Sequence, residues 1–410
     1  MVCIIILQMN ILFLLKSYDI GGLEVVTTVL ANKFYTEGHH VVIWAFYEGK
    51  TSLSNRLNKK IPIIYGHGYK VSSDNVSSLR NVLTDNRINL VVNQWGLPFV
   101  PARTLKKASK GLTVKIISVY HNDPSTNGRL KSIEIEMERT QSLSKKLVLY
   151  MKYWCLKQIT AASMRYIYKN SDRFMVLSPS FIDGFRKFTG LKRTEKLIVQ
   201  PNPITIDIPD DTPELKNKQK EIIYVGRVDY NQKRVSRIIE VWSLLEHKFP
   251  DWKLLIVGDG PEKTHFENLS KELGLNRVRF EGFKQPRAYY ERASMLILTS
   301  EFEGFPLVLA ECMSFGVVPA VYGSYSAVYD IIEDGEDGFV IPKTAEGFNA
   351  ALMVEKMADI MATPEKMQSM SLAAIEKSKN YSIEKIYEQW MEVITRLKKH
   401  GIEKNQDTEC

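Results

Sequence analysis

Two glutamates, Glu303 and Glu311, flank the predicted start of a short helix. Pro306 suits the first helical position, because its missing N–H would have no partner there. Gly316 predicts the end of the helix, and Pro319 just beyond it is a second stop signal. The segment therefore predicts a loop that carries one carboxylate and a helix that carries the other about a turn and a half later.

The amino end of this helix is a candidate anion site. The backbone N–H groups of residues 304–307, which are Gly304, Phe305, Pro306 (without an N–H of its own) and Leu307, lie at the positive end of the helix dipole and suit a phosphate. Glu303 would reach a group beyond that phosphate, and Glu311 a hydroxyl on the other side. The layout predicts a site for a nucleotide diphosphate sugar. The open alternative is an ordinary amphipathic helix with two glutamates.

A basic loop follows the predicted strand 221–225. It contains Gly226, Arg227 and Lys233. A guanidinium and an ammonium at the carboxyl end of a strand suit two phosphates and would offset the charge that develops when a nucleotide diphosphate leaves. The alternative is a solvated basic loop, since Arg234 and Arg237 lie nearby.

Two further signals lie in the first half of the chain. Gly21 and Gly22 follow the first predicted strand, where glycine lets the backbone approach a phosphate, although a tight turn explains them equally well. His121 follows the predicted strand 115–120, where a histidine is either structural or part of a site.

These residues need elements that bring them together. Apolar runs at 11–15, 41–45, 90–93 and 115–120 predict buried strands, and a helix between the first two ends at Gly38. A second alternation follows a proline-rich stretch, with strands at 221–225, 253–257, 278–281, 295–298 and 317–321 and helices at 236–248, 262–273 and 287–292. We expect an α/β protein with two Rossmann-like, doubly wound domains that face each other across a cleft, with ligands beyond the carboxyl ends of the strands.

The expected domains are 1–205 and 206–382, each of about 200 residues, and a final helix at 383–399 that packs back on the first. Residues 1–205 carry 29 Lys and Arg against 13 Asp and Glu, a net +16, whereas the remainder carries 26 against 34, a net −8. The basic half would attract an anionic surface. A long helical pattern at 133–168 is rich in basic and aromatic residues, which predicts an acceptor or membrane element or a helix with a solvated basic face (Lys145, Lys146, Tyr150, Lys152, Tyr153, Trp154, Lys157, Arg165).

Other features narrow the class of protein. No run reaches the roughly 18 apolar residues of a membrane span, and residues 1–15 do not resemble a signal peptide. The role of residues 1–8 stays open. The cysteines Cys3, Cys155, Cys312 and Cys410 fit no metal or disulfide spacing, which favours the cytoplasm.

Taken together, these motifs resemble the retaining glycosyltransferases of family 4, which have the GT-B fold. The matching segments are GGLE at 21–24, GRVDYNQK at 226–233, VGDGPE at 257–262, and the pair Glu303 and Glu311. The opening segment is similar to the subset that builds bacterial surface polysaccharides and lipopolysaccharide cores.

The resemblance implies catalytic roles for Glu303, Arg227, Lys233 and His121. It implies donor-binding roles for Gly21, Gly22, Arg227, Lys233, Phe283, Glu303, Gly304, Phe305, Pro306, Leu307 and Glu311. Glu311 would bind the ribose and Phe283 would lie near the base, with a core or cleft aromatic as the open alternative for Phe283. It implies no metal and no cofactor, with a nucleotide sugar, preferably a UDP-sugar, as donor.

The expected acceptor is a lipid-linked or surface glycan at the cytoplasmic face of the inner membrane. Competing hypotheses are a GT-B sugar-nucleotide epimerase, a glycogen-type phosphorylase and a non-enzymatic module that binds nucleic acid or an anionic surface. A Rossmann dehydrogenase is disfavoured, because no G-x-G-x-x-G follows the first strand. No motif supports nucleic-acid binding.

Overall fold

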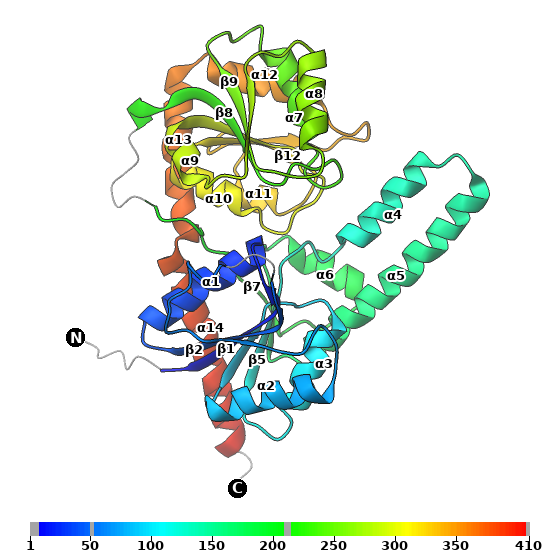
Figure 1. Cartoon of the computed structure of the whole chain (residues 1–410), viewed down its shortest axis with the longest axis vertical. Coiled ribbons are helices and arrows are strands. Elements are labelled where there is room, and N and C mark those ends of the chain that lie inside the picture. The colour runs from blue at the N-terminus through cyan, green and yellow to red at the C-terminus, as the bar shows by residue number, and fades with distance from the viewer. Residues whose placement is uncertain (1–7, 50–52, 209–214, 407–410) are drawn as a thin grey trace. The chain divides into compact units, whose positions relative to one another are not determined.

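The computed structural model describes residues 8–49, 53–208 and 215–406, and the side chains up to residue 398. Cys3, Cys410 and most of the proline-rich stretch lie outside the described residues. The chain divides into two compact units (Figure 1). Unit 1 is Met1–Thr205 with Ile383–Cys410, and unit 2 is Ile206–Ser382.

Unit 1 is built on a seven-stranded parallel sheet with the order β3-β2-β1-β4-β5-β6-β7. The order reverses between β1 and β4, which makes their carboxyl ends the switch point of this sheet. Its strands are β1 (Asn10–Tyr18), β2 (His40–Glu48), β3 (Ile63–Tyr65), β4 (Leu90–Asn93), β5 (Lys115–Tyr120), β6 (Arg173–Val176) and β7 (Leu197–Val199). Its helices are α1 (Gly22–Thr36), α2 (Ser73–Asp85), α3 (Phe99–Ala108), α4 (Gly128–Arg139), α5 (Leu143–Lys169), α6 (Phe181–Thr189) and α14 (Ile383–Gln406).

Helices cover both faces of this sheet because the side chains of β1 alternate between them. Leu12 and Leu14 pack in one apolar cluster with Leu79 of α2 and Leu105 of α3. Phe13 points the other way, and its ring lies 6.2 Å from that of Phe34 in α1. A strand buried on both faces reads as a continuous apolar run, which is why the run at 11–15 was recognisable in the sequence.

The last helix, α14, belongs to unit 1 and packs on α1. The ring of Phe34 lies 6.2 Å from that of Trp390, and His39 forms a 2.9 Å hydrogen bond with the Tyr387 hydroxyl. The helix is longer than the sequence indicated, since it continues to Gln406.

The prediction of one long helix at 133–168 is wrong, because two helices occupy this segment. It contains the end of α4 and most of α5, which form a helical hairpin that extends from the sheet of unit 1 (Figure 1). The chain leaves the helical conformation at Thr140, and the Ser142 hydroxyl then caps α5 by accepting from the Lys145 N–H at 3.4 Å. A serine cap inside an otherwise helical pattern is the signal that the sequence interpretation missed.

Unit 2 is built on a six-stranded parallel sheet with the order β10-β9-β8-β11-β12-β13, and its switch point lies between β8 and β11. Its strands are β8 (Gln219–Val225), β9 (Lys253–Val257), β10 (Val278–Gly282), β11 (Ala293–Leu298), β12 (Val318–Gly323) and β13 (Phe339–Pro342). Its helices are α7 (Val235–Leu245), α8 (Lys263–Glu272), α9 (Arg287–Arg292), α10 (Leu307–Ser314), α11 (Val328–Ile331), α12 (Ala350–Met361) and α13 (Pro364–Ser378), with short 3₁₀ turns at Leu215–Asn217 and Lys379–Tyr381.

Candidate functional site

The basic loop and the acidic loop of unit 2 meet at the switch point of its sheet. Arg227 and Lys233 follow β8, whereas Glu301 and Glu303 follow β11, the neighbouring strand. Because parallel strands end at the same edge, the two loops leave the sheet side by side. The sequence pattern gave each loop a charge, and the strand order brings them together.

Asp229 organises the basic loop. Its Oδ1 accepts from the backbone N–H of Gln232 at 2.7 Å and of Lys233 at 3.0 Å, and its Oδ2 accepts from Arg227 Nε at 2.7 Å. The Arg227 side chain remains 61% exposed, whereas the Asp229 carboxylate is buried. One buried carboxylate therefore fixes the loop and one edge of the guanidinium, whose Nη2 donates to Gln232 Oε1 at 3.3 Å.

Lys233 and Glu303 form the central ion pair of the site, with 2.6 Å between Nζ and Oε1. Both side chains are largely buried, so water screens the pair weakly. The Tyr325 hydroxyl is also buried, and burial together with the Glu303 charge raises its pKa well above the usual value. Neutral Tyr325 lies near the Glu303 charge and leaves Lys233 as its counter-ion.

Close backbone packing shapes the floor of the site. Gly226 and Gly258 directly follow β8 and β9 with φ of +152° and +151°, which favour glycine. A Cβ on Gly258 would lie 1.8 Å from the carbonyl oxygen of Gly226, so no other residue fits this crossing. The glycine of each motif is required by the sheet edge itself.

Helix α10 begins one residue later than expected. Pro306 is its N-cap, with φ −70° and ψ 101°, and the first helical residue is Leu307. The helix ends as predicted, since Gly316 takes φ +70° and the N–H groups of Gly316 and Val317 donate to Met313 and Cys312. The Phe305 ring packs 5.2 Å from Tyr381, so this residue can offer a ligand only its backbone.

Glu311 lies inside α10 and is 5% exposed. The Tyr290 hydroxyl donates to its Oε2 at 3.2 Å, and burial beside this carboxylate raises the pKa of Tyr290 well above its usual value. Phe283 behaves in the opposite way, because its side chain follows β10 and is 65% exposed. Phe283 is therefore not a core residue.

The remaining predicted residues, Gly21, Gly22 and His121, belong to unit 1 at the carboxyl edge of its sheet. Gly21 is the N-cap of α1 in an extended conformation, and a Cβ there would lie 2.4 Å from the carboxylate of Glu24. His121 Nε2 donates to Gln94 Oε1 at 2.7 Å, and burial lowers the pKa of the imidazole to about 4. His121 is therefore neutral at physiological pH.

The sequence interpretation missed Glu24 as an ionisable group of unit 1. Burial raises the pKa of its carboxyl to about 7, with Asp19 adding to the shift and Lys16 opposing it. The glutamate of the GGLE segment was visible, but its burial was not.

Two family models match the chain in succession. The model described as "Glycosyltransferase Family 4" covers residues 20–208, and "Glycosyl transferases group 1" covers residues 207–377. This chain belongs to the family 4 glycosyltransferases. The two matches meet at the boundary between the units, and both sheets have the α/β architecture of the GT-B fold.

Some curated relatives match this glycosyltransferase over nearly its whole length, and others over about half of it. A Campylobacter jejuni protein named "GalNAc-alpha-(1->4)-GalNAc-alpha-(1->3)-diNAcBac-PP-undecaprenol alpha-1,4-N-acetyl-D-galactosaminyltransferase" is 24% identical over 95% of this chain and 99% of its own length. An uncharacterized glycosyltransferase of Haemophilus influenzae is 33% identical, but the match spans 49% of this chain and 56% of that protein.

Solved structures share the fold at lower identity. Anabaena HepE in complex with UDP-glucose aligns with a TM-score of 0.71 and 16% identity, covering 95% of this chain and all of that one. The lipopolysaccharide outer core galactosyltransferase WaaB aligns with a TM-score of 0.67 and 18% identity, covering 95% and 99%.

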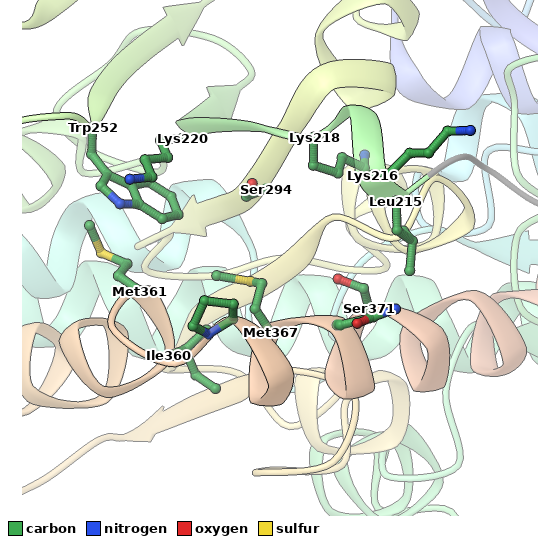
Figure 2. A pocket seen from close by; sticks show the side chains of 12 residues that line it. Leu215, Lys216, Lys218, Lys220, Trp252, Ser294, Ile360, Met361, Met367 and Ser371 are labelled. Atoms are coloured by element: carbon green, nitrogen blue, oxygen red, sulfur yellow. The ribbon is translucent and has the colours of Figure 1, made fainter.

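A separate apolar cavity of about 350 Å³ lies in unit 2 of this glycosyltransferase, between the start of β8 and helices α12 and α13 (Figure 2). Trp252, Ile360, Met361 and Met367 form its apolar side, and Lys216, Lys218 and Lys220 also line it. Lys218 donates to the Tyr290 carbonyl at 2.6 Å and Lys220 pairs with Asp251 at 3.1 Å. The cavity lies at the amino end of β8, and neither Arg227 nor Glu303 lines it.

Two kinds of feature are absent from the described residues of this family member. No group of three or more His, Cys, Asp or Glu residues there could hold a metal ion. No helix within the described ranges is long and apolar enough to cross a membrane.

Proposed function

We propose that this chain transfers a hexose from a nucleotide sugar to a lipid-linked or surface glycan with retention of the anomeric configuration. The observation that carries the proposal is the meeting of Arg227, Lys233 and Glu303 at the switch point of unit 2, beside the amino end of α10. Two cations, one carboxylate and a helix start supply complementary contacts for a sugar diphosphate.

The donor contacts follow from these positions. Arg227 and Lys233 would bind the diphosphate, the backbone of residues 304–307 would face the phosphate and sugar, and Glu303 would accept from sugar hydroxyls. Glu311 would accept from the ribose hydroxyls, and exposed Phe283 would lie against the base. For Gly21 and Gly22 of unit 1, backbone contact with a phosphate stays a prediction.

The proposed reaction exchanges one bond at the anomeric carbon for another. The bond from C1 to the diphosphate oxygen breaks, the acceptor hydroxyl oxygen bonds to C1 from the same face, and its proton passes to the leaving diphosphate. Arg227 and Lys233 stabilise the charge that develops on that diphosphate. Neutral His121, whose Nε2–H donates to Gln94, would accept a hydrogen bond from a sugar hydroxyl at Nδ1. Because these cations neutralise the leaving group, we propose a reaction without metal or cofactor.

A UDP-sugar is the proposed donor. HepE, which shares the fold, was solved with UDP-glucose, and this supports uridine without deciding the sugar.

The proposed acceptor is a glycan carried on a lipid at the cytoplasmic face of the inner membrane. The name of the Campylobacter relative includes a diphosphate-linked undecaprenol, and a Salmonella relative is named a lipopolysaccharide galactosyltransferase.

Helix α5 supports membrane association. Its exposed apolar residues recur at helical spacing along one face, with Leu143 83% exposed (Leu143, Leu147, Tyr150, Trp154). Exposed Lys145, Lys146 and Lys152 lie on the same helix. Apolar residues flanked by lysines suit an anionic bilayer surface.

The test is transfer itself. Purified protein is incubated with UDP-, GDP- and ADP-hexoses and a lipid-linked glycan extract, and nucleotide release and product are followed, with the anomeric configuration read by NMR. We expect release with one nucleotide series only, retention in the product and strong loss in Arg227→Ala, with Arg287→Ala as the exposed control in α9. Conversion of the donor sugar without any acceptor would instead identify a sugar-nucleotide epimerase.

A further inference from the structure

A second cavity, of about 720 Å³, lies within unit 1. Lys16 near the end of β1, Trp95 just after β4 and Arg129 at the start of α4 are among its lining residues. These positions surround the carboxyl ends of β1 and β4, which form the switch point of the first sheet, where ligands of open α/β sheets bind.

Two cations face this cavity without a carboxylate. Among the residues that the structure describes, no Asp or Glu oxygen lies within 4.0 Å of Lys16 or Arg129. Lys16 Nζ instead lies over two aromatic rings, 5.3 Å from the centre of Tyr69 and 5.5 Å from that of Trp95. Two like charges in one cavity favour an anionic ligand.

Nearby groups leave this charge largely uncompensated. Glu24 interacts with Lys16, but burial raises the pKa of its carboxyl to about 7, so it is only partly ionised at neutral pH. The Asn127 side chain occupies the first N–H groups of α4 by accepting from Arg129 and Leu130. Anion binding therefore falls to the Lys16 and Arg129 side chains.

Apart from Asn127 and a few hydroxyl side chains, the rest of the cavity wall is apolar, and this apolar surface continues along α5. Leu97, Phe99 and Ile159 line it. From Ile159 a row at four-residue spacing runs along the helix through exposed Cys155 and Met151 to Leu147. A ligand that fits has an anionic head and a long apolar tail.

We propose that this cavity binds the phosphate or diphosphate of the lipid-linked acceptor, with the lipid chain along the Leu147 to Ile159 row. The inference rests on the proposed function and specifies its acceptor. Lys16 and Arg129 contact the phosphate oxygens, and Tyr69 and Trp95 offer ring faces to the first sugar. The site thus selects an acceptor by its phosphate and lipid, not only by its terminal sugar.

Binding of farnesyl diphosphate to the full chain tests this, read by titration calorimetry. We expect Lys16→Met and Arg129→Met each to weaken binding at least tenfold, and Lys131→Met to leave it within twofold. Lys131 is a matched control because it lies on the same helix and pairs with Glu134 at 3.1 Å. Ile159→Asn should weaken farnesyl diphosphate but not inorganic diphosphate.

Two results would overturn the proposal. One is equal affinity of wild type and both cation variants for farnesyl diphosphate. The other is equally tight, equally mutation-sensitive binding of short-chain phosphatidylglycerol, which would assign the cavity to a bilayer headgroup. Thermal stabilisation by UDP, measured on the same variants, should be unchanged. Absence of that stabilisation in wild type would count against the donor site of unit 2, independently of the acceptor result.

Discussion

Lys233 Nζ and Glu303 Oε1 lie 2.6 Å apart although 70 positions separate the two residues along the chain. The contact exists because β8 and β11 are hydrogen-bonded neighbours. Each residue alone fits many roles. As a pair they place opposite charges at one sheet edge. In the proposed complex, the diphosphate would bind Lys233 and the sugar hydroxyls would bind Glu303.

Replacing Lys233 by Met should lower kcat by about 10²- to 10³-fold, because one group that stabilises the leaving diphosphate is lost. The variant should also be less stable by about 2–4 kcal/mol, since Glu303 stays buried without its counter-ion. The double variant Lys233→Met with Glu303→Gln should recover stability but not activity. Melting temperature and kcat, measured on both variants, separate the two effects. A double variant with wild-type activity would exclude the catalytic role.

Glu24 should make the protein less stable as the pH rises from about 5 to 8. Burial raises the pKa of its carboxyl to about 7 in the folded state, above the value of 4.5 in an exposed chain. The folded state therefore binds the proton more tightly, and this contribution is lost as pH passes through 7. Glu24→Gln should flatten the melting temperature against pH and stabilise the protein at pH 8. Exposed Glu138→Gln is the control, and an identical profile in Glu24→Gln would contradict the prediction.

His121 should remain neutral throughout the pH range of activity. Burial lowers the pKa of its imidazole to about 4, below the usual 6.5, so acid favours the unfolded state and stability from this group is lost as pH falls from 6.5 towards 4. NMR titration of labelled histidines should show one imidazole, absent in His121→Gln, that stays unprotonated at pH 5.5. Protonation of that signal near pH 6.5 would refute the assignment.

The exposed face of α5 should bind anionic vesicles. Leu147→Glu combined with Trp154→Glu should reduce co-sedimentation with phosphatidylglycerol-containing vesicles at least tenfold, because both changes place charge in the apolar interface. Leu372→Glu, an exposed leucine of α13, is the matched control. Equal loss in the control, or unchanged binding in the double variant, would argue against membrane docking by the hairpin.

Removing the Trp390 ring should destabilise unit 1. Trp390 is 2% exposed and packs against Phe34, so Trp390→Ala should cost about 3–5 kcal/mol in the free energy of unfolding. Exposed Arg396→Ala on the same helix should change it by less than about 0.5 kcal/mol. Urea unfolding followed by hydrogen exchange of β1 and β2 amides would assign the loss to this unit.

The sequence by itself determined the α/β class and the position of most parallel strands in both units. Continuous apolar runs such as 11–15 and 254–257 reflect burial on both faces, and this is a local property of the chain. It also determined the end of α10, because Gly316 takes a positive φ that few other residues tolerate. Short strands such as β3 and β7 were missed because three residues carry too little periodicity.

Only the tertiary structure decided which charged residues act together. Strand order places Lys233 beside Glu303. Burial raises the pKa of the Glu24 carboxyl and lowers the pKa of the His121 imidazole. The hairpin of α4 and α5 likewise exposes an apolar face that a single helical pattern did not reveal. Spacing along the chain encodes local conformation, whereas pairing across a sheet and the loss of water around a charge depend on contacts between segments far apart in sequence.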